Sequence, residues 1–210
     1  MKKLLLSLSM MFMALAASAQ SCPDNNHPHI IDLGLPSGTK WACCNVGANK
    51  PENYGGYYAW GETEEKDSCD LNNYTHCDGS ILTFHDIGSV IAGTPFDVAH
   101  VKWGGNWVMP SPEQIKELLD NCLFDWATIS NVDGLLLTSK ENKNYIFLPA
   151  AGLKGFELMH VGKGGYYWSS TQYPSEPINA YHLHLYPGGV WWNSNSVRFV
   201  GYSIRPVWIP

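Results

Sequence analysis

The sequence predicts an α+β fold built mainly from short antiparallel strands and long loops, with one clear amphipathic helix at about residues 112–121. Three observations indicate this class. One stretch carries helix-capping residues followed by an apolar face with helical spacing. The C-terminal third repeats short strand-like segments separated by turn residues. The 210-residue chain is rich in glycine (20) and tryptophan (9) and only 15% charged, as expected of strands and turns.

The first 19 residues are typical of a secretory signal peptide. Lys2 and Lys3 precede a long apolar run, and Ala17-Ser18-Ala19 predicts cleavage before the next residue. This run is too short to span a bilayer, and no later stretch reaches the roughly 20 apolar residues of a spanning helix. The sequence therefore predicts an exported protein without a transmembrane segment, located outside the cell, at its surface or in the periplasm.

Lipidation of Cys22 is an alternative processing route, but Ala19-Gln20-Ser21 lacks the aliphatic residue of a good lipobox. Residues 20–29 are polar and contain proline, which predicts a flexible arm. Residues 30–210 are then expected to form a single domain, since we find no linker inside them.

Two strands are expected at the start of this domain. Ile31, Leu33 and Leu35 alternate with other residues, a Pro-Ser-Gly turn follows, and residues 40–47 resume as a second strand. Residues 61–80 are the most polar stretch and indicate a surface loop. Their Asp and Asn residues are calcium-ligand types, but no D-x-[DN]-x-[DN]-G pattern is present, so no cofactor is predicted.

The predicted helix has a capping box at its N-terminus. Ser111 caps it, Pro112 suits the first helical position, and Gln114 completes the S-x-x-Q pattern. Its buried face follows at i, i+3, i+4 and i+7: Ile115, Leu118, Leu119 and Cys122. Five strand-like segments come later, at 145–152, 164–171, 179–186, 189–193 and 197–207.

The six cysteines allow 15 disulfide pairings, and an oxidising compartment would let such bonds persist. We favour Cys69 with Cys77, which would close a polar loop, and Cys44 with Cys122, which would tie an early strand to the helix end. A zinc site needs paired C-x-x-C or C-x-x-H spacings, which are missing from the sequence, so no metal site is predicted.

Six motifs in one order carry a resemblance to a known family: DLGLPSGTKWACCNVGA, YGGYYAWGE, DVAHVKWGGNWVMPSPEQIKELL, FLPAAG, GYYWSST and SIRPV. The set resembles the Fibrobacter succinogenes major paralogous domain, common in exported proteins of gut Bacteroidetes. That family is similar to the formylglycine-generating enzyme, or sulfatase-modifying factor, whose fold is a version of the C-type lectin-like fold. The resemblance implies such a fold here, with Trp41, Trp103, Trp107, Trp168 and Arg205 as framework residues.

The resemblance does not extend to the enzyme's activity. Formylglycine-generating enzymes use a pair of reactive cysteines near their C-terminal end, and this chain has no cysteine after Cys122. We therefore assign no catalytic residue.

Two other possible catalytic sites are less favoured than a non-catalytic interpretation of the same residues. His182 and His184 should share one strand face, but spacing shows no third metal ligand, which favours two surface histidines. Glu62, Glu64 and Glu65 resemble an acid–base set for glycoside hydrolysis, but in a polar loop a solvated acidic run is the better interpretation.

Eleven aromatic residues fall between residues 166 and 210. Because side chains alternate along a strand, Trp191 and Trp192 cannot both point into the core of a one-sided sheet. Tyr and Trp beside Asn and Ser are typical of recognition surfaces. The predicted ligand-binding residues are Trp191, Trp192, Asn193, Asn195 and Arg198, with Tyr173 and His184 nearby.

The sequence thus predicts a non-catalytic binding module that presents this surface to a glycan or to a surface protein. The formal net charge of −6 argues against nucleic acid as a partner. Two alternatives stay open: a divergent formylglycine-generating-like or metal-assisted hydrolytic enzyme, and a structural cell-surface protein.

Overall fold

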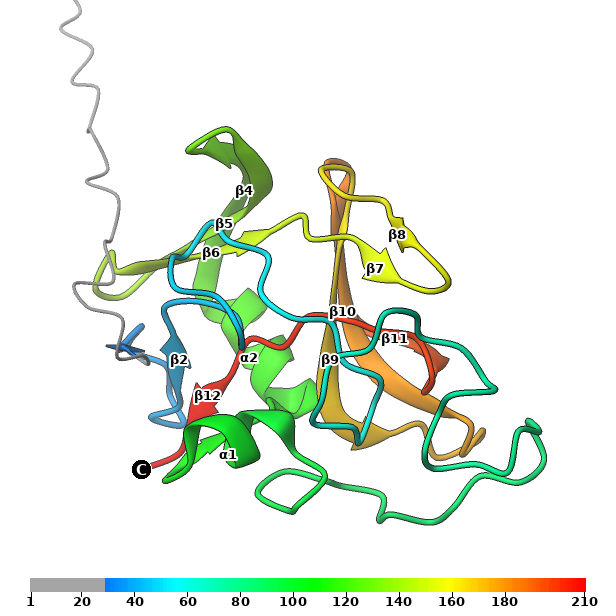
Figure 1. Ribbon diagram of the computed structural model, residues 1–210. Coiled ribbons are helices and arrows are strands. Elements are labelled where there is room, and N and C mark those ends of the chain that lie inside the picture. Colours follow the sequence, from blue (N-terminus) through cyan, green and yellow to red (C-terminus); the bar gives the residue numbers. More distant parts are fainter. Residues whose placement is uncertain (1–28) are drawn as a thin grey trace, which may run out of the picture.

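The computed structural model describes residues 29–210 (Figure 1). The expected signal peptide, most of the arm and Cys22 lie outside the described residues. In the part of the chain that is described, no helix is long and apolar enough to cross a membrane. The elements in chain order are β1 (Ile30–Ile31), β2 (Lys40–Ala42), α1 (Val98–Trp103), β3 (Trp107–Val108), α2 (Pro112–Asn121), β4 (Cys122–Ile129), β5 (Val132–Ser139), β6 (Tyr145–Pro149), β7 (Leu153–Lys154), β8 (Leu158–Met159), β9 (Gly165–Gln172), β10 (Asn179–Tyr186), β11 (Gly189–Val197) and β12 (Val207–Trp208).

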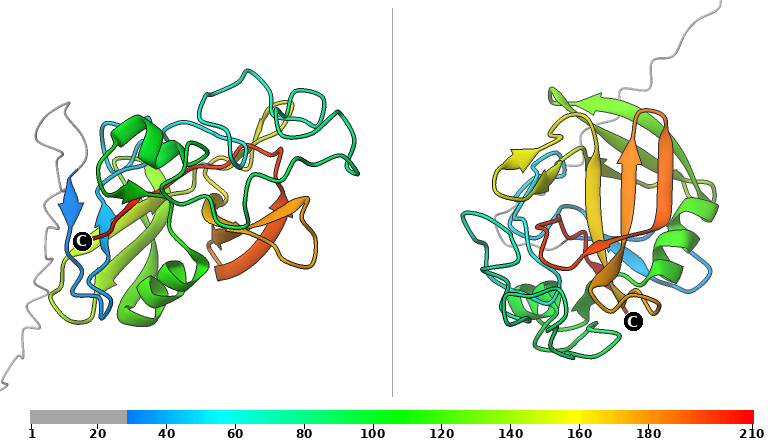
Figure 2. Two further views of the ribbon diagram at one scale, coloured as in Figure 1. Left: turned by 90° about the horizontal axis from the view of Figure 1, so that it is seen from below. Right: turned by 90° about the vertical axis from the view of Figure 1, so that its right-hand side faces the viewer.

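The strands form four small antiparallel sheets, which confirms the predicted α+β class. The first has the order β1-β2-β12-β3, so the last strand of the chain lies between two early ones (Figure 1). The others are β4-β5-β6, β11-β10-β9 and the hairpin β7-β8. Figure 2 shows β9, β10 and β11 side by side as one layer, which we call the C-terminal sheet.

Helix α2 has the predicted bounds and cap. The Ser111 hydroxyl accepts from the Gln114 backbone N–H, and the Gln114 side chain accepts from the Ser111 backbone N–H, which completes the capping box. Helix α1 was not predicted. Its six residues are too few to show a period, and its best sequence signal is the N-cap Asp97, whose carboxylate accepts from Ala99 and His100 N–H groups.

Residues 122–139, for which the sequence predicted no strand, form the hairpin β4–β5. Its turn residues Ser130 and Asn131 both have positive φ (51° and 64°), as a two-residue hairpin turn requires. Most of β4 is exposed or half-buried, including Leu123 and Phe124. A strand that is exposed along most of its length lacks the alternation of apolar and polar residues from which strands are predicted. By contrast, the segment 197–207 predicted as one strand is mostly irregular and joins neighbours through single bridges before β12.

Two large apolar clusters lie on either side of the C-terminal sheet. One contains Trp41, Leu118 and Leu183, and the other contains Trp60, Trp168 and Tyr202. Arg205 is buried and donates to the Asn45 side chain and to the carbonyls of Ala42, Cys43 and Phe147. The framework role expected of Trp41, Trp107, Trp168 and Arg205 agrees with their burial, and half-buried Trp103 packs edge-on against Trp107.

Neither expected disulfide is present. The Cys44 thiol donates to the carbonyl of Ala48, and the Cys77 thiol lies near the carbonyls of Leu71 and Tyr74. Cys69 is buried in the long loop between β2 and α1, and Cys122 is buried in the first apolar cluster. Cys44 and Cys122 belong to the same apolar cluster without being cross-linked, and all four cysteines act as small apolar side chains.

Candidate functional site

The two adjacent tryptophans of β11 point to opposite faces of the C-terminal sheet. Trp191 is 52% exposed, whereas Trp192 is half-buried and packs against the first apolar cluster. This agrees with the prediction that both could not lie in the core. A bulge follows Trp191, because Trp192 and Asn193 together lie opposite a single β10 residue.

Trp191 belongs to a row of rings that crosses all three strands of the sheet. His184 of β10 is the register partner of both Trp191 on β11 and Tyr166 on β9. The Tyr166 and His184 rings are stacked, with centroids 4.4 Å apart and planes within 10°. The Trp191 ring lies 5.3 Å from His184. Antiparallel pairing thus turns three distant sequence positions into one continuous aromatic surface.

Two further rings extend this row. Tyr186 lies 4.9 Å from Trp191 and 5.4 Å from His184. At the other end His160, which follows β8 in a left-handed conformation (φ 61°), shares a 3.0 Å hydrogen bond between its Nδ1 and the Tyr166 hydroxyl. We call these five residues the aromatic face: His160, Tyr166, His184, Tyr186 and Trp191.

Burial affects the titration of His184, one of the two histidines of the aromatic face. Burial lowers the pKa of His184 below its usual value, and the nearby His160 lowers it further. His182, on the same side of β10, is only 5% exposed, and burial followed by repulsion from His184 lowers its pKa to about 3. The lowered pKa favours the neutral form of the His184 ring, and neutral rings that reach the surface have the chemistry of a stacking platform.

His182 lies on the same side of the C-terminal sheet as the aromatic face but is buried. Its ring lies 4.9 Å from Tyr202 and 5.8 Å from Trp168, and its Nδ1 has no hydrogen-bond partner within the described residues. His182 and His184 do share a face, as predicted, but the expectation of two surface histidines is wrong for His182. Nowhere in residues 29–210 do three His, Cys, Asp or Glu side chains come close enough to hold a metal ion.

The structure does not bring the other predicted site residues to this face. Asn195 is the register partner of Tyr181, so both point away from the side that bears His184. Tyr173 packs edge-on against Tyr181, with centroids 5.1 Å apart, on that opposite side. Asn193 is exposed at the bulge beside Trp191.

Arg198 is the clearest departure from the predicted surface. It is 1% exposed, and its guanidinium lies against the rings of Trp60, Tyr74 and Phe84. The predicted site residues therefore lie in three places: Trp191 and His184 on the aromatic face with Asn193 at the bulge beside them, Trp192, Asn195 and Tyr173 on the opposite side of the sheet, and Arg198 in the interior.

Sequence reasoning missed Tyr166, Tyr186 and His160. A signal for Tyr186 was present, because it continues the period-two pattern of His182 and His184 within one strand. Tyr166 and His160 depend on strand pairing and on a loop conformation, which residue spacing does not show.

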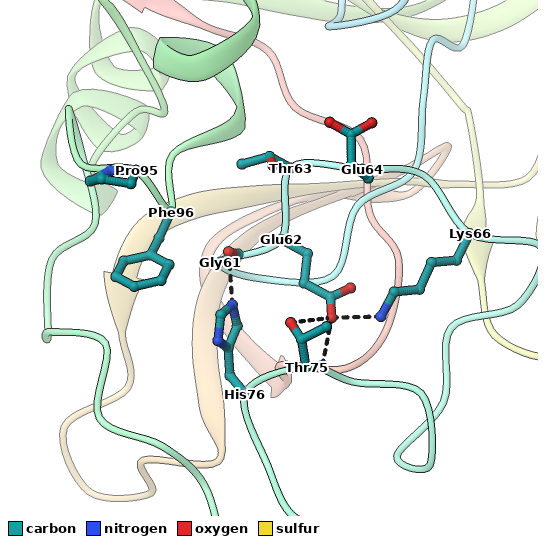
Figure 3. Close-up of a pocket in the computed structure, with 9 residues that line it drawn as sticks. All are labelled: Gly61, Glu62, Thr63, Glu64, Lys66, Thr75, His76, Pro95 and Phe96. Carbon is teal, nitrogen blue, oxygen red and sulfur yellow. Dashed lines mark hydrogen bonds and ion pairs between the residues drawn. The ribbon is translucent and has the colours of Figure 1, made fainter.

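A second candidate site is a pocket of about 300 Å³ lined by residues of the long loop between β2 and α1 (Figure 3). Glu62 lies in its wall, buried, and its Oε1 accepts from Lys66 Nζ (2.6 Å), Thr75 N (2.7 Å) and Thr75 Oγ (2.8 Å). The expectation of a solvated acidic run holds for Glu64 and Glu65, which are exposed, and is wrong for Glu62. Because Lys66 compensates its charge, Glu62 serves here to hold the loop together.

Comparison of the chain with protein-family models, with curated proteins and with solved structures found no match.

Proposed function

We propose that this protein is an exported binding module that recognises a glycan through the aromatic face. The observation that carries the proposal is the continuous row of Tyr166, His184 and Trp191 across three strands. The motif resemblance to the Fibrobacter succinogenes major paralogous domain, with its expected C-type lectin-like fold, and the predicted N-terminal export signal support the same role.

A sugar ring suits this surface for physical reasons. The apolar C–H side of a pyranose stacks on an exposed indole, and the Trp191 ring is half-exposed at the edge of the sheet. The His184 and Tyr186 rings pack against Trp191, and exposed Asn193 lies two residues further along β11, so these three side chains supply hydrogen-bonding groups for sugar hydroxyls. The rings are held by strand pairing and by each other, so little side-chain entropy is lost on binding.

A protein ligand is the second candidate, favoured by one observation. The β7–β8 hairpin, whose chain continues directly into His160, exposes Phe156 (79%), Leu158 and Met159. An apolar extension of this kind is typical of a protein-binding surface. The same patch is the basis for the third possibility, a structural surface protein that associates with its own copies.

The deciding experiment is a glycan-array screen of the purified protein beside a Trp191→Ala variant. Trp208→Ala is a matched control, because Trp208 is half-buried in the first sheet, away from the aromatic face. We expect at least a tenfold loss of affinity in Trp191→Ala, about 1.4 kcal/mol, and wild-type binding in Trp208→Ala.

Glycan binding that survives Trp191→Ala would refute the aromatic face as the site. Absence of glycan binding in the wild-type protein would refute the glycan proposal. Capture of a surface protein lost in Phe156→Ala would then support the second candidate, and concentration-dependent sedimentation would support the third.

A further inference from the structure

Arg198 follows the last residue of β11 and is buried at the end of the C-terminal sheet opposite the aromatic face. Its Nε donates to the Tyr74 hydroxyl (3.0 Å), one terminal nitrogen to the Pro177 carbonyl (3.2 Å) and the other to the His85 carbonyl (3.5 Å). A guanidinium carries five N–H donors, so two remain beyond these three bonds.

The positive charge of Arg198 is not balanced by a carboxylate. In the described part of the chain none of the ion pairs involves Arg198. It is held by aromatic rings, with its Cζ 4.7 Å from the Trp60 centroid, 5.4 Å from Phe84 and 5.7 Å from Tyr74. Ring faces compensate the charge of a buried cation only in part, so an anion next to the guanidinium would interact with it strongly.

A pocket of about 430 Å³ has Arg198 in its wall. Its size lies within the usual range for small-molecule sites, roughly 300–1,000 Å³. The exposed residue Ser89 supplies a hydroxyl donor in the wall, whereas His85 Nε2 is already bonded to Asp78 Oδ1 (3.1 Å). Phe84 and Pro177 supply apolar surface. Asp86 also lines the pocket, but its Oδ1 accepts from the Gly88 N–H, and it is exposed at the rim.

We propose that the Arg198 pocket binds the carboxylate group of a small ligand. The guanidinium fork matches a carboxylate in geometry and charge, and the low-polarity ring environment strengthens that interaction. Two sources share this chemistry: a uronic acid sugar and an acidic amino acid. This site uses no residue of the aromatic face, so a test of carboxylate binding here is independent of the proposed glycan binding.

The test uses side-chain NMR of the ¹⁵N-labelled protein. The chain has only two arginines, Arg198 and Arg205, so their Nε–H signals are readily told apart. Arg205 is equally buried, has all three nitrogens bound to protein oxygens and lines none of the three pockets described at residues 29–210, which makes it an internal control. Sodium acetate is titrated against sodium chloride at equal ionic strength, followed by D-glucuronate and N-acetyl-aspartate amide.

We expect a saturable shift of the Arg198 signal with acetate, none with chloride, and a stationary Arg205 signal. The stronger of the two larger probes then identifies the source of the carboxylate. Asp86→Asn removes the only acidic side chain in the pocket wall and should tighten acetate binding about two- to fivefold. Ser89→Ala should weaken it.

The proposal is overturned if acetate produces no saturable shift of the Arg198 signal in either protein, the wild type or Asp86→Asn. Equal movement of both arginine signals, or equal movement with chloride, would likewise overturn it, since either result would indicate a non-specific ionic effect. The decisive titration is done on the unchanged protein, so it does not depend on the folding of a variant.

Discussion

Replacing His182 by phenylalanine should remove a large part of the protein's sensitivity to acid. His182 lies between Trp168, Tyr166 and Tyr202, and its buried Nδ1 has no hydrogen-bond partner in the described chain. A phenyl ring matches this apolar contact set, so the folded structure should tolerate the change.

The magnitude follows from the pKa of His182, which burial lowers to about 3 in the folded protein. In the unfolded chain the ring has its usual pKa near 6.5, so below that pH the unfolded state binds a proton that the folded state does not. Stability is therefore full above pH 6.5 and falls as the pH decreases toward 3. Linkage gives a loss of about 2 kcal/mol from His182 between pH 8 and pH 5.

The assay is urea unfolding of both proteins at pH 8 and pH 5, followed by tryptophan fluorescence. His76 and His184, whose pKa values burial also lowers, are present in both proteins and contribute equally. The loss of unfolding free energy on acidification should be about 2 kcal/mol smaller in His182→Phe. An equal loss in the two proteins would refute the burial argument for His182.

Two further predictions concern the framework. Asp97→Asn should lower the unfolding free energy by about 2–3 kcal/mol at pH 7 in urea titrations, because the buried carboxylate accepts four backbone N–H bonds and an amide group cannot; a loss below about 1 kcal/mol would contradict this. When the protein is denatured without reductant, iodoacetamide should alkylate Cys69, Cys77 and Cys122 in full by mass spectrometry; protection of Cys69 and Cys77 together, or of Cys122, would indicate the disulfides that the structure lacks.

Local chemistry made some elements of this fold predictable. Ser111, Pro112 and Gln114 specify the start of α2 through bonds within four residues, and the prediction agreed with the structure to the residue. The alternation of Ile31, Leu33 and Leu35 was likewise reproduced in their burial. The hairpin β4–β5 was missed because its outer strand packs against little, which leaves no apolar period to detect.

The candidate site was only partly predictable for a different reason. Alternation along β11 separated Trp191 from Trp192, which needs only the two-residue period of a strand. The partners of Trp191 are set by register, and a bulge shifts that register between His182 and His184. Arginine is usually a surface residue, so the residue type gives no reason to expect Arg198 in the interior. Arg198 is buried because residues 60–85 fold around it, and no local pattern encodes those contacts.

The position of β12 has a consequence for how the chain folds. Val207 and Trp208 pair with β2 on one side and with β3 on the other, so this sheet cannot close while residue 208 is still being synthesised. Until then β2 and β3 keep unpaired edges, and an emerging chain would have native-like pieces but no complete framework. Assembly of the first sheet thus waits for residues 207 and 208, and deletion of residues 207–210 should block it.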